Sequence, residues 1–279
     1  MDLDSQETKD RPPRGDMQLH GLRFAPEEMT AHGGEDMNMF DSRFEVFLAD
    51  TALSRRIHFQ LRYRVFCLDQ GFEDPTRAML DQERDHWDKE SLHFLVRERA
   101  TGQWVATMRM ILPQAKPFPV ESLCDLSLQN DLTYHRDASC EISRLCIVRR
   151  YRGRQALSRS RQRPAAMISE GVTSRTEPEI MLGLFRAGLE YSRANGLRQW
   201  YFLVTPALAR IIGRIGVALT EIGSPVEHRG TRIPYVTDPF RSCSDAMQYS
   251  PVIARMFSRP LPAYRLFSEI HPESREAVA

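Results

Sequence analysis

The sequence predicts a mixed α/β domain in which helices flank a central mixed sheet. Two apolar runs that flank residues 100–103 have the composition of a β-hairpin with a Gly-containing turn. Residues 139–148 are more continuously apolar, which is typical of a central strand buried on both faces. Other segments repeat apolar residues with helical spacing. Strand and helix patterns therefore alternate along the 279 residues, and we expect one folded domain.

The first expected elements are a short strand over residues 44–50 and the helix that follows it. Thr51 or Ser54 can cap this helix, and Gly71 is expected to lie beyond its end. Its apolar positions recur every fourth residue, at Leu53, Ile57, Leu61 and Val65. Residues 72–89 are polar and acidic and contain a proline, so they predict a loop or broken helix that lies over another part of the fold.

The second strand of the hairpin carries a charge among aliphatic side chains. Strict alternation places Arg109 on the same face as Val105, Thr107 and Ile111. Arg109 must therefore reach the sheet edge or have a buried partner, because an unpaired buried charge is costly.

The rest of the chain predicts further helices and strands in a defined order. A short helix follows the proline-rich connection after the hairpin, and the segments beyond residue 240 are expected to be helical and peripheral. Between them we expect a helix, a buried strand, a short helix and two closing strands, over residues 179–195, 199–205, 206–215, 219–222 and 233–236. The resulting division is a disordered leader (1–42), the folded domain (43–240) and a helical tail (241–279).

Composition excludes several classes of protein. A formal net charge of +1 argues against a nucleic-acid-binding protein, because a domain-wide basic excess is expected there. The five cysteines are odd in number and form no C-x-x-C motif, so neither a disulfide framework nor a metal site is predicted. The N-terminus has no export signal and no apolar run is long enough to span a bilayer, so we expect a cytoplasmic protein.

Glu141 and Arg144 lie on the expected central strand. Charges in such a strand require partners. Strict alternation places these two side chains on opposite faces, so they can serve one site only if a bulge lies between them. A bulge would also free backbone N–H groups that can stabilise charge on a thioester oxygen.

Two other local features have both a structural and a functional interpretation. Arg62 lies one helical turn before Phe66, and the pair can be an arginine packed over a core aromatic or part of a site. Asp85 and Asp88 could hold a cationic substrate or a metal, or they could simply be solvated, and no third clustered acid supports a metal.

An arginine run follows the central strand. Residues 149–163 contain seven arginines and no acid, at positions 149, 150, 152, 154, 159, 161 and 163. The run can be a solvated loop, or it can dock an acidic partner or a phosphate-bearing cofactor.

The order of these motifs resembles a known family. LRYRVF, ERDHWD, VATMRMILP and CEISRLCIV occur in the order found in acyl-homoserine-lactone (autoinducer) synthases and their relatives in the acyl-CoA N-acyltransferase (GNAT) superfamily, and the resemblance covers roughly residues 44–237. Cys67, the segment 71–73 and the segment 118–124 make the sequence most similar to acyltransferases associated with the PEP-CTERM/exosortase system. The lactone synthases usually have Trp where this chain has Phe72.

The resemblance implies a GNAT-like fold and roles for particular residues. Glu141 would assist amine deprotonation, with Arg144 and Arg109 organising the catalytic site. A guanidinium does not give up its proton at physiological pH, so neither arginine is expected to react. The implied substrate-binding residues are Arg62, Phe66, Phe72, Asp85, Asp88 and Ser143.

The resemblance also bears on the acyl donor. Many acetyl-CoA-dependent members have a Gly-rich turn after the central strand, whereas this chain has Gln155 at the second Gly position. The incomplete turn favours an acyl carrier protein, docked on Arg149, Arg150, Arg152 and Arg154, over CoA as donor. No tightly bound cofactor is expected.

The implied activity is transfer of a fatty acyl group from a carrier thioester to a small amine, such as an amino acid. The first alternative is an acyl-homoserine-lactone synthase that uses S-adenosylmethionine. The second is a non-catalytic module that binds an acyl carrier.

Overall fold

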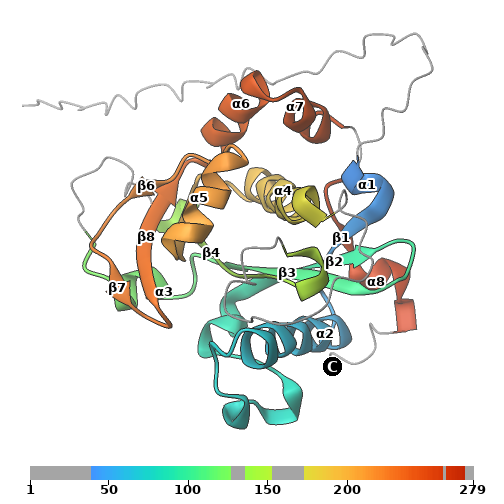
Figure 1. Ribbon diagram of the computed structural model, residues 1–279, viewed down its shortest axis with the longest axis horizontal. Coiled ribbons are helices and arrows are strands. Elements are labelled where there is room, and N and C mark those ends of the chain that lie inside the picture. Colours follow the sequence, from blue (N-terminus) through green and yellow to red (C-terminus); the bar gives the residue numbers. More distant parts are fainter. Residues whose placement is uncertain (1–38, 127–135, 153–172, 260–261, 274–279) are drawn as a thin grey trace, which may run out of the picture. The chain divides into compact units, whose positions relative to one another are not determined.

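A computed structural model describes residues 39–126, 136–152, 173–259 and 262–273 (Figure 1). These residues form a nine-stranded mixed sheet, in the order β6-β8-β5-β4-β3-β2-β1-β9, with β7 paired to β8. The strands are β1 (Phe44–Leu48), β2 (Ser91–Glu98), β3 (Trp104–Ile111), β4 (Ser139–Ile147), β5 (Gln199–Val204), β6 (Thr220–Glu221), β7 (Val226–Glu227), β8 (Thr231–Thr237) and β9 (Arg265–Leu266). The mixed α/β prediction is therefore confirmed.

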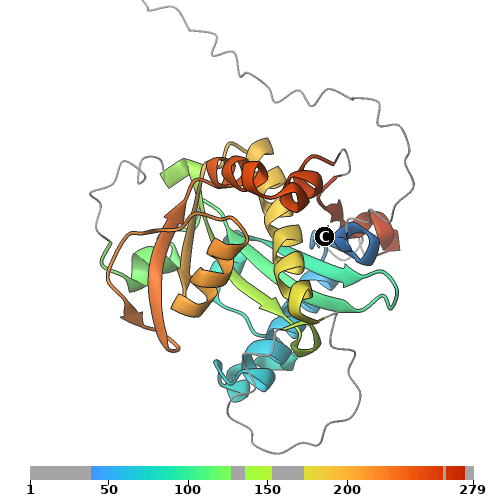
Figure 2. The same ribbon diagram turned by 45° about the horizontal axis from the view of Figure 1, so that its top comes forward.

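Helices cover both faces of this sheet. They are α1 (Met39–Arg43), α2 (Ala52–Arg62), α3 (Pro119–Leu123), α4 (Thr173–Ala194), α5 (Pro206–Arg214), α6 (Pro239–Tyr249), α7 (Pro251–Phe257) and α8 (Phe267–Ile270). The long helix α4 crosses the face opposite α2, and α6 and α7 lie on the same side as α4 (Figures 1 and 2). Gly188 lets α4 approach the sheet closely, because an added Cβ would lie within 3.4 Å of Met108, Met110 and Trp200.

The helix predicted after the first strand is confirmed. The Thr51 side chain accepts a hydrogen bond from the Ser54 N–H at 3.1 Å, which caps α2. After Arg62 the chain continues as a π-helix (Tyr63–Asp69), and Gly71 follows with φ of +65°. The acidic segment beyond it forms short 3-10 turns (Pro75–Arg77, Met79–Asp81 and His86–Glu90), so the expected broken helix is also confirmed.

The hairpin and the central strand also form where the sequence places them. Strands β2 and β3 pair antiparallel, and β4 lies between β3 and β5. Only the first part of β4 pairs with β5, from Ser139↔Gln199 to Ile142↔Phe202, although β4 continues to Ile147 beside β3. The two parallel strands therefore separate after Ile142.

Strand β4 contains a bulge, which the sequence analysis required if Glu141 and Arg144 were to serve one site. Ser143 pairs with Arg109 and Cys146 with Thr107, so β4 has one more residue than β3 over this interval. Arg144 adopts the left-handed conformation there, with φ of +49°. The extra residue brings Arg144 to the same side of the strand as Glu141 and Ser143.

The structure corrects the predicted domain boundaries. The helix α1 lies within the expected leader, yet Phe40 is fully buried and packs against Gly183 of α4. The expected peripheral tail contributes β9, which pairs in parallel with β1. In the helix that follows, the Ser268 N–H donates to Asp50 at 3.0 Å. Both ends add aromatic side chains to the core, since Phe40 and Phe267 are fully buried. Residues 1–38 lie outside the described part of the chain.

Candidate active site

A cavity of about 170 Å³ opens where β4 and β5 separate. One part of its wall is apolar and comes from the end of β4, from β5 and from α5. These residues are Leu145, Phe202, Leu203, Val204, Leu208 and Ile212. The other part is polar and charged, and it includes Glu73, Asp85, Arg109, Glu141, Ser143, Arg144, His228, Arg229 and Arg232. The cavity can therefore receive an apolar chain and a polar group together.

Glu141 is the buried acid of this cavity. It lies on β4 before the strands separate, and it is 1% exposed. Burial raises the pKa of Glu141 to about 8, although the Val120 N–H donates to its carboxylate at 2.8 Å and opposes the shift. A carboxyl group with such a pKa can exchange a proton with an amine near neutral pH.

Asp88 connects two buried arginines beside the cavity. Arg62 and Arg109 lie 2.6 and 2.9 Å from its Oδ1 atom. Its other oxygen accepts from the Asp85 N–H at 2.8 Å, which caps the turn His86–Glu90. Burial raises the pKa of Asp88, but the two guanidinium groups outweigh burial and hold it far below the usual range. Asp88 does not line the cavity, and in this structure it holds Arg62 and Arg109 in place.

Arg62 also differs from the prediction. Its side chain is fully buried, donates to Glu83 at 2.5 Å and to Asp88 at 2.6 Å, and does not line the cavity. Helix α2 packs onto the sheet with this side chain inward, and the acidic segment 83–88 closes over it. Arg62 therefore supports the wall of the site from outside the cavity.

Glu83 is a residue that the sequence analysis missed. It pairs with Arg62 and, at 2.9 Å, with Arg144. Burial alone would raise the pKa of Glu83, but the guanidinium groups of Arg62 and Arg144 outweigh burial and lower this pKa to about 2. The acidic motif carried a signal for it, since Glu83 stands two residues before Asp85.

Arg109 has the buried partner that the alternation pattern required. It donates to Asp85 at 2.5 Å and to Ser143 at 2.9 Å, and it is 1% exposed. Arg144 reaches the same acid from the bulge, with an N–O distance of 3.0 Å to Asp85. The geometry thus joins Asp85, Arg109, Ser143 and Arg144 in one hydrogen-bonded group at the cavity.

Two aromatic residues line the cavity from the segment after α2. The guanidinium of Arg144 lies 5.9 Å from the centre of the Phe66 ring. Phe72 faces Arg232 at the same distance, 5.9 Å, and is 42% exposed. Both line the cavity, and their contact with a substrate stays a prediction.

Further residues of the cavity were given no individual role by the sequence analysis. Glu73 forms an ion pair with Arg229 at 2.7 Å. His228, Arg229 and Arg232 come from the hairpin of β7 and β8, and Trp87 comes from the acidic segment. The short, weakly patterned strand β7 gave no clear signal in the sequence.

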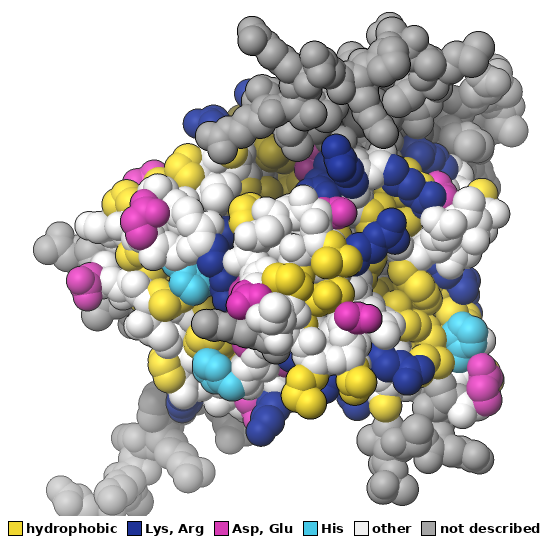
Figure 3. All heavy atoms as spheres, turned by 60° about the horizontal axis from the view of Figure 1, so that its bottom comes forward, with side chains coloured by type: hydrophobic (Ala, Val, Ile, Leu, Met, Phe, Trp, Pro, Cys, Tyr) yellow, Lys and Arg dark blue, Asp and Glu magenta, His cyan; other side chains and the backbone are white. Residues whose placement is uncertain are grey.

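The arginine run is only partly described. Arg150 pairs with Glu98 and Arg152 with Asp69, at 3.0 and 2.9 Å, while Arg149 is exposed. Arg154 and the later arginines lie outside the described residues. On the face drawn in Figure 3, basic side chains are distributed among hydrophobic ones.

Other chemistries find less support in the described residues. No group of three or more His, Cys, Asp or Glu that could hold a metal ion occurs among them. Cys146 lies 3.0 Å from the Thr107 hydroxyl, and burial raises its pKa to about 11, so it is a core thiol. No helix in the described part of the chain is long and apolar enough to cross a membrane.

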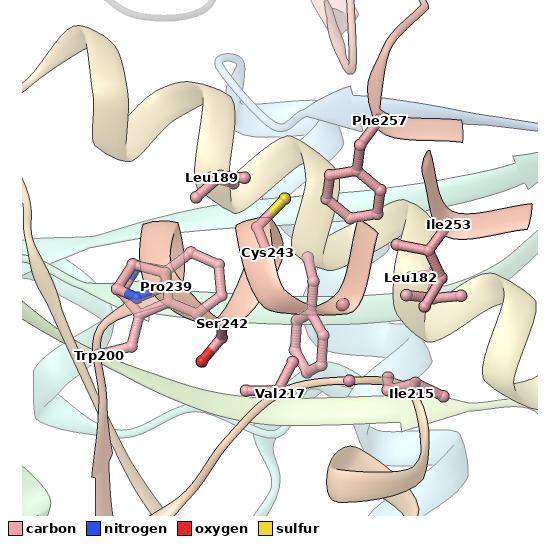
Figure 4. Close-up of a pocket in the computed structure, with 13 residues that line it drawn as sticks. Leu182, Leu189, Trp200, Ile215, Val217, Pro239, Ser242, Cys243, Ile253 and Phe257 are labelled. Atoms are coloured by element: carbon pink, nitrogen blue, oxygen red, sulfur yellow. The ribbon is translucent and has the colours of Figure 1, made fainter. Parts of the chain in front are cut away.

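A second cavity, of about 30 Å³, lies between α4 and the helices α6 and α7 (Figure 4). Its lining is apolar apart from Ser242, and no charged side chain contributes to it. Its one ionisable group is the Cys243 thiol, whose pKa burial raises to about 11, so the cavity is poorly suited to acid–base chemistry.

Comparison with known proteins decides the fold. Residues 61–161 match the family described as Acetyltransferase (GNAT) domain. BjaI, a CoA-dependent acyl-homoserine lactone synthase solved with MTA, has a TM-score of 0.51 and 15% identity, over 79% of this chain and 96% of that one. The chain has the GNAT fold. BjaI with SAM and isopentyl-CoA gives a TM-score of 0.50 and 16% identity over the same shares, 79% and 96%.

FeeM, an N-acyl amino acid synthase from uncultured soil microbes, is also similar, with a TM-score of 0.48 and 13% identity over 75% of this chain and 97% of that one. No curated protein matched the sequence. The GNAT domain match spans the π-helix, the acidic segment, the hairpin and β4, so it includes Glu83, Asp85, Arg109, Glu141 and Arg144.

Proposed function

We propose that this protein is an N-acyltransferase that moves a fatty acyl group from a carrier thioester to the primary amine of a small metabolite. The acceptor class is an amino acid or a related amine, and the location is the cytoplasm. The observation that carries the proposal is Glu141, a fully buried carboxyl group with a pKa of about 8 in a cavity that is both apolar and charged.

The reaction is a direct transfer. Glu141, directly or through water, takes a proton from the acceptor ammonium, and the neutral amine nitrogen attacks the thioester carbonyl. The new C–N bond forms as the C–S bond breaks, and the attacking nitrogen loses one of its two remaining protons, which the thiolate leaving group takes up. No covalent enzyme intermediate is needed, which agrees with the raised pKa of the Cys146 thiol.

The bulge in β4 supplies a place for the thioester oxygen. Strand β4 leaves its pairing with β5 after Ile142, and the extra residue lies beside Arg144. Backbone N–H groups at this point can stabilise the negative charge that develops on the oxygen. Asp85 and Ser143 hold Arg109 and Arg144 in position around it.

The apolar wall formed by β5 and α5 accommodates the acyl chain. Leu203, Val204, Leu208 and Ile212 face the cavity. An acyl group gains free energy when such a wall removes it from water, by roughly 0.8 kcal/mol per methylene. This favours a fatty acyl group over an acetyl group.

We propose an acyl carrier protein as the donor, with acyl-CoA as the other form of the thioester. Carrier proteins are acidic, and Arg149 is exposed at the end of β4 next to Arg150 and Arg152. Arg154 completes the proposed docking group. The sequence motifs further support an association with the PEP-CTERM/exosortase system.

The test is a product analysis. Purified protein is incubated with palmitoyl carrier protein, or with palmitoyl-CoA, and a pool of the twenty amino acids, and products are read by mass spectrometry. An N-acyl amino acid supports the proposal. An acyl lactone formed when S-adenosylmethionine is added would instead show a homoserine-lactone synthase. Carrier binding without any product would indicate a non-catalytic module.

A further inference from the structure

We infer that Arg232 binds the carboxylate of the acceptor, and that the acceptor is therefore an amino acid or another amine that carries a carboxylate. The inference rests on the proposed function and adds a specificity-determining residue to it. Arg232 lies at the start of β8 and lines the same cavity as Glu141.

The hairpin of β7 and β8 holds this arginine against the cavity. Val226 pairs with Arg232, and the connecting turn has positive φ at Arg229 and Gly230, of +56° and +87°. The Arg232 Nε–H donates to the carbonyl of His228 at 2.8 Å. This bond fixes the plane of the guanidinium, and the Phe72 ring packs against it at 5.9 Å.

While Glu141 is protonated, as its raised pKa of about 8 favours at neutral pH, the other charges around the cavity leave one positive charge in excess. Four carboxylates form ion pairs with four guanidinium groups, namely Glu73, Glu83, Asp85 and Asp88 with Arg62, Arg109, Arg144 and Arg229. Arg232 is a fifth guanidinium. Among the described residues, its hydrogen bonds go to the backbone carbonyls of His228 and Arg229, and it forms no ion pair.

The neighbours of Arg232 do not provide the missing negative charge. Burial lowers the pKa of Arg232, and the guanidinium groups of Arg229 and Arg144 lower it further. The Glu73 carboxylate raises it, but Glu73 is already paired with Arg229 at 2.7 Å. Burial and the same arginines lower the pKa of His228, which is therefore neutral at physiological pH. A bound carboxylate would pair with Arg232 and relieve this repulsion.

The proposed reaction suggests which anion binds. An acceptor amino acid brings an amine for Glu141 and a carboxylate in one small molecule, and both groups then face the cavity. The phosphate of a carrier's phosphopantetheine group has similar charge chemistry. The experiment must separate these two sources.

The first measurement is steady-state transfer from palmitoyl carrier protein to an amino acid and to its primary amide. Wild type is compared with Arg232→Gln, and with Arg241→Gln as a control, because Arg241 is exposed on α6. We expect Arg232→Gln to raise the KM for the amino acid on the order of tenfold to hundredfold, because a charged hydrogen bond is lost. The KM values for the amide and the donor should not change, and Arg232→Lys should restore part of the loss.

An unchanged KM for the amino acid would overturn the inference. A rise confined to the donor KM would also overturn it and would assign Arg232 to the donor phosphate. Calorimetric binding of N-palmitoylglycine and N-palmitoylglycinamide gives a readout without turnover. Wild type should prefer the acid and Arg232→Gln should not. If wild type forms no N-acyl product but still binds the acid more tightly than the amide, the proposed function fails and the anion site stands. If wild type binds the acid and the amide equally, the inference about Arg232 fails.

Discussion

Glu141 and Arg144 line one cavity although they lie three positions apart on the same strand. Regular alternation would place them on opposite faces of the sheet. The extra residue in β4, with Arg144 in the left-handed conformation at φ of +49°, turns the guanidinium to the side of the carboxyl group. The bulge therefore builds the site, and its backbone is under conformational strain that only glycine avoids.

This strain makes a prediction for residue 144. Arg144→Ala and Arg144→Gly remove the same ion pairs with Glu83 and Asp85, but only glycine adopts a positive φ without cost. We expect the Gly variant to be more stable than the Ala variant by about 1 kcal/mol, measured by urea unfolding. Equal stabilities would mean that position 144 has an ordinary strand conformation.

Removal of the Arg62 guanidinium should destabilise the whole domain. Arg62 is fully buried between Glu83 and Asp88, so Arg62→Met leaves both acids without one of their partners. We expect a loss of about 3–5 kcal/mol in the free energy of unfolding. The matched control is Arg64→Met, because Arg64 is exposed and lies two residues away. A loss in Arg62→Met no larger than in the control would contradict the network.

Two buried histidines should make the fold sensitive to acid. His58 and His93 lie with ring centres 4.6 Å apart, and three of their four ring nitrogens have no partner among the described residues. Arg62 and Asp88 act electrostatically on both histidines, and Arg109 also acts on His93. Burial lowers the pKa of both histidines, that of His93 from 6.5 to about 4.

The unfolded chain therefore binds protons below pH 6.5 that the folded chain does not. The contribution of the two histidines to stability should be complete above that pH and should be lost as pH decreases toward 4, by up to about 1.4 kcal/mol per pH unit for each histidine. Glu141 gives the opposite slope between pH 4.5 and about 8, so the histidine contribution is read from the difference between wild type and a histidine variant. Glu83 and Asp88 contribute only at lower pH, because their unfolded pKa values are 4.5 and 3.8. Urea unfolding between pH 7.5 and 5.5 should show a steeper slope in wild type than in His58→Leu. Identical slopes would show that His58 does not remain neutral in the fold.

Gly183 tests whether α1 belongs to the domain. A Cβ atom at this position would overlap the Phe40 ring. We expect Gly183→Ala to destabilise the protein by about 1–3 kcal/mol, and to cost much less in a Phe40→Ala background. A double-mutant cycle measures the coupling. Strict additivity of the two changes would contradict the contact between α1 and α4.

The sequence predicted most of the elements that build the site, because their signals are local. The cap at Thr51, the turn at 100–103 and the apolar run of β4 each depend on residues close together in the chain. Arg109 was also placed correctly, since a charge among aliphatic residues requires a partner.

Other features depend on contacts between distant segments. Arg62 became a buried support because the segment that contains Glu83 folds back over α2. Arg232 belongs to a hairpin whose paired segments are too short to show a clear alternation of apolar and polar residues. Phe40 and β9 were assigned to a leader and a tail, because only the folded sheet and α4 show what they cover.

The most direct test of the account is single-turnover transfer from palmitoyl carrier protein to the acceptor amino acid, measured against pH. The wild-type rate should rise with pH through about 8, because Glu141 must lose its proton to accept one from the amine. Glu141→Gln should fold and bind the carrier but transfer more slowly on the order of a hundredfold to ten-thousandfold. Glu121→Gln is the control, because Glu121 is a partly exposed acid near Glu141. It lies on helix α3 next to Val120, whose N–H donates to the Glu141 carboxylate. A Glu141→Gln variant with the wild-type rate and pH profile would contradict the account.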